Sequence, residues 1–162
     1  LNGLYVKDQL TGFYNRFGYD RMAKGVFEDI NAQGCAIHVL FLDIDDMKVI
    51  NDRYGHDKGD LAIKTVSKVV NGSCRRTDFK MRYGGDEFLV AGECREDCSA
   101  EQAAERIQHM MAQTVRERRL PYPLSAGIGF VYIEPEEKLD LRASLRMVDA
   151  KMYATKKERR KR

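Results

Sequence analysis

The sequence predicts an α+β fold in which helices pack on a mostly antiparallel sheet. Segments whose apolar residues recur every three or four positions alternate with short apolar runs rich in branched and aromatic residues. Two of these runs are joined by a short glycine turn of the kind that makes neighbouring strands antiparallel. With 162 residues, 43% of them hydrophobic, the chain is long enough to bury the core of one domain.

The first half of the chain predicts a helix, a strand and a second helix. Residues 15–32 carry apolar side chains at helical spacing, and the pattern stops near Gly34. The nearly unbroken apolar run at residues 35–42 predicts a strand buried on both faces. A second helix is expected to begin after Gly59 and Asp60, because a carboxylate suits a helix N-terminus. Its buried face is Ala62, Ile63, Val66, Val69 and Val70.

A β-hairpin is predicted in the middle of the chain. Residues 79–83 and 88–91 are apolar runs typical of strands, and Gly84 and Gly85 lie between them. Glycine adopts positive φ values at little cost, so we expect both to form a tight turn.

The remaining segments predict a helix, a strand and a final helix. Ser99 and Gln102 fit a capping box at the start of the third helix. Residues 124–133 form another strand-like run. Apolar residues at helical spacing then predict a helix from about residue 140 into a basic tail.

The charge is concentrated at the end of the chain. The net charge is +3, but six of the seven residues 156–162 are basic and one is acidic, so 22 basic and 24 acidic residues remain elsewhere. A nucleic-acid-binding protein usually carries a basic stripe across its fold, so we expect no nucleic-acid partner. The sequence has neither a signal peptide nor an apolar stretch that could span a bilayer. We therefore expect no membrane contact by this segment.

The cysteines indicate a reducing compartment. Cys35, Cys74, Cys94 and Cys98 are scattered, without a paired framework or the spacing of a zinc site. A cytoplasmic location follows, either for the protein itself or for the cytoplasmic domain of a larger, membrane-bound protein.

Two carboxylates are the first candidates for chemistry. Asp43 follows the strand at residues 35–42, and Asp86 begins the second arm of the hairpin, so both can converge at one sheet edge. Carboxylates at such an edge suit Mg²⁺, which prefers one or two of them together with phosphate oxygens. Taken alone, each also suits a structural role, Asp43 as a cap and Asp86 in a turn.

Four separated motifs occur in the order typical of one family. The chain reads DQLTGFYNR at residues 8–16, DIDDMKVINDRYGHDKGD at 43–60, RYGGDEF at 82–88 and DAKMYATK at 149–156. In this it resembles the GGDEF family of diguanylate cyclase catalytic domains. The resemblance implies a palm-like fold of the ferredoxin-like or nucleotidyl-cyclase-like kind over residues 8–162, with residues 1–7 as the end of an upstream linker or helix. It also implies the condensation of two GTP molecules into cyclic di-GMP.

The resemblance assigns metal-binding and catalytic roles. Asp43, Asp86 and the carbonyl of Ile44 would hold two Mg²⁺ ions per GTP, with Mn²⁺ as an alternative. Asp86 would also assist removal of the 3′-hydroxyl proton, supported by Glu87, while Lys48 would stabilise developing phosphate charge.

Substrate recognition is implied for a second group. Asn51 and Asp60 would bind guanine, because an ionised carboxylate accepts from its N–H groups and an amide complements its acceptors. His56 would lie close to the nucleotide, although a histidine alone also suits a half-buried loop. Gly84 and Gly85 would lie beneath the triphosphate.

The basic tail would contribute cations. Lys156 and Arg160 match family residues that contact the phosphates. The chain departs from the family pattern at Arg159, where a glycine is usual. Most of the tail equally suits a solvated basic end.

An inhibitory product site is implied upstream of the hairpin. Arg75 and Asp78 have the R-x-x-D spacing, with five residues between Asp78 and Gly84, and Arg106 matches a second inhibitory arginine of some relatives. Arg75 could grip phosphate and guanine together, and cyclic di-GMP would then inhibit its own synthesis. Alternatively, Arg75 and Asp78 pair only with each other or with water.

The implied reaction requires two copies of the chain, because each protomer holds one GTP. We therefore expect a homodimer, at least transient, controlled by an upstream sensor or regulatory domain. Two alternatives remain. One is a catalytically silent module that binds cyclic di-GMP or GTP. The other is a polymerase or purine cyclase of palm-like architecture, which Asn51 and Asp60 disfavour.

Overall fold

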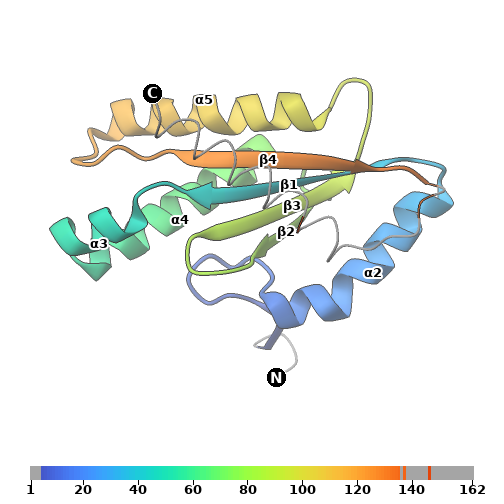
Figure 1. Cartoon of the computed structure of the whole chain (residues 1–162), viewed down its shortest axis with the longest axis horizontal. Coiled ribbons are helices and arrows are strands. Elements are labelled where there is room, and N and C mark those ends of the chain that lie inside the picture. Colours follow the sequence, from blue (N-terminus) through green and yellow to red (C-terminus); the bar gives the residue numbers. More distant parts are fainter. Residues whose placement is uncertain (1–4, 136, 138–145, 147–162) are drawn as a thin grey trace.

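A four-stranded antiparallel sheet forms the centre of the part of the chain that the computed structural model describes, namely residues 5–135, 137 and 146. Its strands lie in the order β2-β3-β1-β4. They comprise β1 (Ile37–Ile44), β2 (Phe79–Arg82), β3 (Glu87–Glu93) and β4 (Ala126–Ile133). Helices cover both faces of the sheet (Figure 1). The predicted α+β architecture is confirmed.

Strand β1 lies between β3 and β4 and determines the register of the sheet. Asp43 near its C-terminal end is paired with Glu87 on β3 and Gly127 on β4. Side chains alternate between faces along a strand, so Leu40 and Leu42 point to one core and Val39 to the other. Asp43 therefore lies near the C-terminal end of a buried central strand, at the end of the sheet between the two apolar cores.

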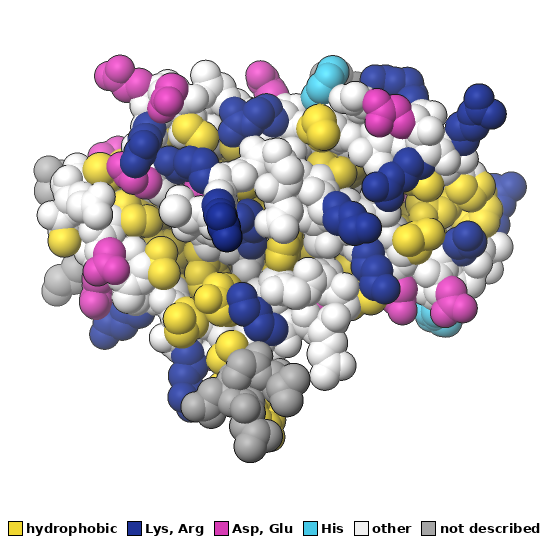
Figure 2. Space-filling model, turned by 180° about the vertical axis from the view of Figure 1, so that it is seen from behind, with side chains coloured by type: hydrophobic (Ala, Val, Ile, Leu, Met, Phe, Trp, Pro, Cys, Tyr) yellow, Lys and Arg dark blue, Asp and Glu magenta, His cyan; other side chains and the backbone are white. Residues whose placement is uncertain are grey.

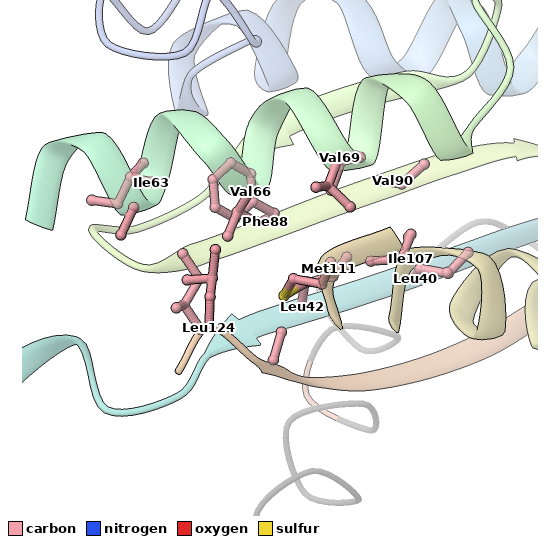
Figure 3. Close-up of a cluster of buried hydrophobic side chains, with 14 of the residues drawn as sticks. Leu40, Leu42, Ile63, Val66, Val69, Phe88, Val90, Ile107, Met111 and Leu124 are labelled. Atoms are coloured by element: carbon pink, nitrogen blue, oxygen red, sulfur yellow. The ribbon is translucent and has the colours of Figure 1, made fainter. Parts of the chain in front are cut away.

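The larger core lies between the sheet and the helices α4 (His56–Ser73) and α5 (Ala100–Arg118). Figure 3 shows side chains of α4, β1, β3 and α5 meeting in this layer. Leu42, Val66 and Phe88 are fully buried there. Each such side chain contributes roughly 1.5–3 kcal/mol of hydrophobic stabilisation.

Helix α2 (Arg16–Ala32) covers the opposite face. Phe27 on this helix and Phe79 on β2 lie in the second core, with ring centroids 6.2 Å apart. The side chain of Asn15 caps the helix by accepting from Gly18 N at 2.7 Å. The prediction of a helix over 15–32 is thus confirmed to within one residue.

The segment between β1 and β2 differs from the sequence prediction. A short helix, α3 (Met47–Tyr54), was not predicted, because eight residues contain too few turns to establish a clear period. Helix α4 begins at His56, whereas the predicted helix began after Gly59 and Asp60. Gly55, with φ +88°, separates the two helices, and Asp57 occupies the first turn where Asp60 was expected.

The other elements agree with the prediction apart from their ends. The first strand is displaced to Ile37–Ile44, β4 begins at Ala126 rather than 124, and the capping box of Ser99 and Gln102 is present. The helix predicted from about residue 140 lies outside the described residues.

The described surface shows no membrane-spanning element and mixed charge. None of the described helices is long and apolar enough to cross a bilayer. On the face drawn in Figure 2, lysine and arginine side chains are dispersed among acidic and hydrophobic ones.

Candidate functional site

The two carboxylate-bearing segments meet at one end of the sheet. Asp43 is paired with Glu87, and the main-chain nitrogen of Ile44 donates to the carbonyl of Asp86 at 2.9 Å. Asp43, Asp86 and Glu87 are half-buried, while the side chain of Ile44 is buried in the larger core. The antiparallel register therefore brings together the acidic residues that the sequence placed 43 positions apart.

The turn before β3 is held by backbone and arginine contacts. Tyr83 N donates to the carbonyl of Glu87 at 2.8 Å. Arg82 donates through Nη2 to the carbonyl of Gly85 at 2.7 Å and through Nε at 3.2 Å. Its Nη1 lies 3.2 Å from Asp8 Oδ1. Arg82 thus joins the N-terminal turn to the glycine turn.

The predicted hairpin is present, but Gly84 and Gly85 form its turn without the positive φ values that glycine permits. Neither has a φ in the left-handed region, whereas Gly12, Gly34 and Gly55 do. A Cβ on Gly84 would lie 2.6 Å from Glu87 Oε2. A Cβ on Gly85 would meet no heavy atom within 4 Å. A side chain at position 84 would therefore displace the Glu87 carboxylate, whereas Gly85 leaves the outer side of the turn open.

A pocket of about 450 Å³ adjoins this turn. Arg16 lies on one wall, where its Nε donates to the carbonyl of Tyr83 at 2.8 Å and its guanidinium lies 4.2 Å from the centroid of the Tyr83 ring. Asp8 on the same wall accepts from the Thr11 hydroxyl at 2.7 Å. Asp8, through Arg82, and Arg16, through Tyr83, thus anchor the N-terminal turn to the hairpin.

The predicted guanine-binding residues gather where α3 meets α4. Asn51 lies on α3, half-buried, and a Cβ on Gly59 of α4 would overlap its Oδ1 atom. His56 and Asp60 are exposed and one turn apart on α4. This cluster follows the β1–α3 connection and thus lies close in sequence to Asp43.

Lys48 lies on the surface of α3. Its Nζ is 3.4 Å from Asp52 Oδ2, and the two side chains are 91% and 68% exposed. A pair this exposed contributes little to stability, so Lys48 is free to reorient toward a ligand. Lys156 and Arg160 lie outside the described residues.

The donor atoms at the end of the sheet fit a hard divalent cation. Asp43, Asp86 and the Ile44 carbonyl supply oxygen only, which Mg²⁺ prefers. Within the described residues no three His, Cys, Asp or Glu side chains are placed to hold a metal by themselves.

Arg75 and Asp78 are paired with each other. Arg75 Nε lies 3.3 Å from Asp78 Oδ1, and Arg75 N donates to Asp78 Oδ2 at 2.8 Å. Arg75 also donates to the carbonyl of Glu93. The Asp78 side chain is 4% exposed and lies over Gly92, where any Cβ would overlap it. The carboxylate is therefore held inside the protein.

Arg106 of α5 lies close to Arg75 and Asp78, which are near Glu93, at the opposite end of β3 from Glu87. Its Nε donates to the carbonyl of Ser73 at 3.1 Å, at the C-terminus of α4. Ser73 is two residues before Arg75, so the three predicted inhibitory residues gather around the end of α4. The guanidinium groups of Arg75 and Arg106 already donate to main-chain carbonyls of the protein.

The cysteines of the described chain are free thiols. Burial raises the pKa of Cys74 to about 12, so this thiol stays protonated at neutral pH. A hydrogen bond with Glu93 raises the pKa of Cys35. Neither thiol is activated as a nucleophile.

Two functionally placed residues were not singled out from the sequence. Arg82 spans the Asp8 carboxylate and the Gly85 carbonyl, and Ser125 contacts Asp45 beside the β1 end. Arg82 lies two positions before Gly84, at the start of the RYGGDEF motif, and this proximity was a local signal. Ser125 is 80 residues from Asp45, so only the tertiary fold brings them together.

Comparison with known proteins gives a family match over nearly the whole chain. The model of the diguanylate cyclase GGDEF domain matches residues 5–162. Diguanylate cyclase DgcP of Escherichia coli is 33% identical over 156 residues, which cover 95% of this chain and 45% of DgcP. Cyclic di-GMP phosphodiesterase NbdA of Pseudomonas aeruginosa is 32% identical over 75% of this chain and 16% of NbdA. The chain thus spans less than half the length of these curated relatives.

The fold is also similar to solved structures. The coiled coil and GGDEF domain of DgcB from Caulobacter crescentus, solved in complex with c-di-GMP, superposes with a TM-score of 0.79. The sequence identity is 25%, and the similarity covers 97% of this chain and 83% of that one.

Proposed function

The chain belongs to the GGDEF family of diguanylate cyclase domains, and on this premise we propose that it condenses two GTP molecules into cyclic di-GMP, releasing two pyrophosphates. The family and its relatives connect the chain with cyclic di-GMP metabolism. One structural observation supports catalytic activity beyond family membership. The register that pairs Asp43 with Glu87 also joins Ile44 to Asp86, so both expected metal-binding segments form one end of the sheet.

In the proposed reaction two protomers face each other, each with one bound GTP. The 3′-hydroxyl oxygen of one GTP attacks the α-phosphorus of the other, and the bond to pyrophosphate breaks. Asp86 would accept the hydroxyl proton as the new phosphodiester forms, and Glu87 would support its charge. GGDEF domains generally use a divalent metal. When bound by Asp43, Asp86 and the Ile44 carbonyl, Mg²⁺ would lower the energy of the alkoxide and of the departing pyrophosphate.

Selectivity for GTP is assigned to the junction of α3 and α4. The Asp60 carboxylate would accept from the guanine N–H groups, and Asn51, held beside Gly59, would complement the acceptors. His56, on the same face of α4 as Asp60, would lie close to the nucleotide. The exposed Lys48 would turn from Asp52 toward phosphate.

Product inhibition through Arg75, Asp78 and Arg106 is part of the proposal. A ligand there would replace the Glu93 and Ser73 carbonyls as acceptors for the arginines. The Asp78 side chain lies in the interior, so it would act mainly by orienting Arg75. DgcB, solved with c-di-GMP, supports ligand binding to a domain of this fold.

The one alternative with support is a silent module that binds cyclic di-GMP or GTP without turnover. NbdA, named as a phosphodiesterase, is as similar as DgcP over the shared region, so similarity alone does not assign cyclase activity. Asp43, Asp86 and Glu87 favour activity, because all three expected carboxylates are present and brought together. A homodimer, an upstream regulatory domain and a cytoplasmic location complete the proposal.

The test incubates the purified chain with GTP and Mg²⁺ at high protein concentration, with a product-degrading phosphodiesterase added in a parallel sample to remove inhibition. Chromatography should show cyclic di-GMP, or its linear breakdown product in the parallel sample, and pyrophosphate in a 2:1 ratio to the dinucleotide. Tight binding of cyclic di-GMP with no product from GTP would instead establish the receptor.

A further inference from the structure

The loop between α5 and β4, residues 119–125, lies against the connection that follows β1. Tyr122 and Leu124 are 2% and 4% exposed and belong to the larger core. Tyr54 of α3 donates from its hydroxyl to the carbonyl of Pro121 at 2.7 Å, and its ring centroid lies 5.5 Å from that of Tyr122. This loop is therefore fixed at several points before it reaches Ser125.

Ser125 is joined to Asp45 by two hydrogen bonds. The Ser125 hydroxyl donates to Asp45 Oδ2 at 2.8 Å, and the main-chain nitrogen of Asp45 donates to the Ser125 carbonyl at 2.9 Å. The next residue, Asp46, has a φ of +57°, so the chain turns sharply there into α3. The paired contact holds Asp45, the first residue after β1, just before this turn.

The peptide unit between Ile44 and Asp45 takes its orientation from these bonds. It is trans, so its N–H and C=O point in opposite directions. The N–H points toward Ser125 on the β4 side. The Ile44 carbonyl therefore faces the β3 side, where the nitrogen of the same residue donates to Asp86. The carbonyl expected to bind metal is thus turned toward the strand that begins beside Asp86, the expected metal-binding residue.

We propose that Ser125 is a positioning residue for the divalent cation, acting through Asp45 on the direction of the Ile44 carbonyl. The inference rests on the proposed function, since it takes this carbonyl as a metal ligand. Ser125 itself contacts no reacting atom. Groups that orient ligand atoms commonly change metal affinity by about 10- to 100-fold when they are removed. A hydroxyl that serves only folding would change stability and leave metal affinity unchanged.

The test measures metal dependence without turnover. Binding of a GTP analogue with a non-cleavable α,β-methylene bridge is followed by titration calorimetry at increasing Mn²⁺ and, separately, in EDTA. The variants are Ser125→Ala, Ser125→Thr, which keeps the hydroxyl, and Asp45→Ala, which removes the same bond from its other end. Thr114→Ala is the matched control, because its hydroxyl donates to the Met110 carbonyl within α5.

Ser125→Ala should raise the half-saturating Mn²⁺ concentration about tenfold and leave binding in EDTA unchanged. Ser125→Thr and Thr114→Ala should match the wild type. Asp45→Ala should raise the half-saturating Mn²⁺ concentration as Ser125→Ala does, and it takes the place of Ser125→Ala in the test if Ser125→Ala does not fold. An unchanged Mn²⁺ requirement in Ser125→Ala, or an equal loss of binding in EDTA, overturns this inference alone. A wild type that binds the analogue identically with and without Mn²⁺ overturns the metal site of the proposed function, and this inference with it.

Discussion

The main-chain nitrogen of Ile44 donates a 2.9 Å hydrogen bond to the carbonyl of Asp86, which fixes the β1 end against the start of β3. One residue back, Asp43 is paired with Glu87. The placement of the acidic side chains is thus a consequence of sheet register, and a one-residue slip would move Asp43 to the other face.

Gly84→Ala should reduce turnover strongly and stability weakly. Its Cβ would lie 2.6 Å from Glu87 Oε2, and this flexible carboxylate tip would move instead of the backbone. We expect cyclic di-GMP formation to fall more than tenfold while the midpoint of thermal unfolding changes by a few degrees at most. Gly85→Ala is the matched variant for stability, because its Cβ meets nothing within 4 Å. Wild-type turnover in Gly84→Ala would show that a Cβ at residue 84 does not disturb the position of Glu87 that turnover requires.

Gly59→Ala should weaken recognition of guanine. The added Cβ would overlap Asn51 Oδ1 and displace that side chain. The expected result is a KM for GTP raised about tenfold, with kcat less affected, since the lost contact is to the base. Gly72→Ala on the same helix is the control, where the Cβ meets nothing and should add roughly 0.5–1 kcal/mol of stability. Equal KM values in both variants would discard the role of Asn51.

Arg75→Ala should relieve inhibition by cyclic di-GMP and also destabilise the fold. Arg75 is the ion partner of Asp78, whose carboxylate would remain buried, so a loss of about 2 kcal/mol in the free energy of unfolding is expected. Urea unfolding and inhibition curves measure the two effects. Arg76→Ala, at an exposed neighbouring position, should change neither. Unchanged inhibition in Arg75→Ala would remove this residue from the product site.

Stability should fall in alkaline solution partly because of Cys74. Burial raises the pKa of this thiol from its ordinary value of 9.0 to about 12. The unfolded chain therefore loses this proton first, so the stabilisation is fully present below pH 9 and is lost as pH rises toward 12. Urea unfolding between pH 8 and pH 10.5 should show a steeper decline for the wild type than for Cys74→Ala. Identical slopes would show that the thiol is not held protonated.

Local sequence patterns were sufficient for the elements that depend on local chemistry. Helical periodicity located α2 and α5, the Ser99 capping box was recognisable, and the glycine turn identified the hairpin. Helix α3 escaped detection because it has eight residues and only Met47 and Ile50 in the core.

Contacts between distant segments could not be predicted in this way. The role of Gly84 depends on the Glu87 rotamer, and the burial of Asp78 depends on the empty space above Gly92 on β3. The bond from Ser125 to Asp45 exists only once β4 lies beside β1. Sequence spacing indicated which residues matter, and the sheet register determined which of them meet.

The most direct measurement compares Mg²⁺-dependent conversion of GTP to cyclic di-GMP by the wild type and by Asp86→Ala, with product quantified by chromatography and folding checked by circular dichroism. The wild type should form cyclic di-GMP, and Asp86→Ala should retain the fold and lose at least 100-fold in rate, a difference of about 2.7 kcal/mol in transition-state stabilisation. A folded Asp86→Ala domain that still converts GTP at the wild-type rate would contradict the assignment of this sheet end as the catalytic site.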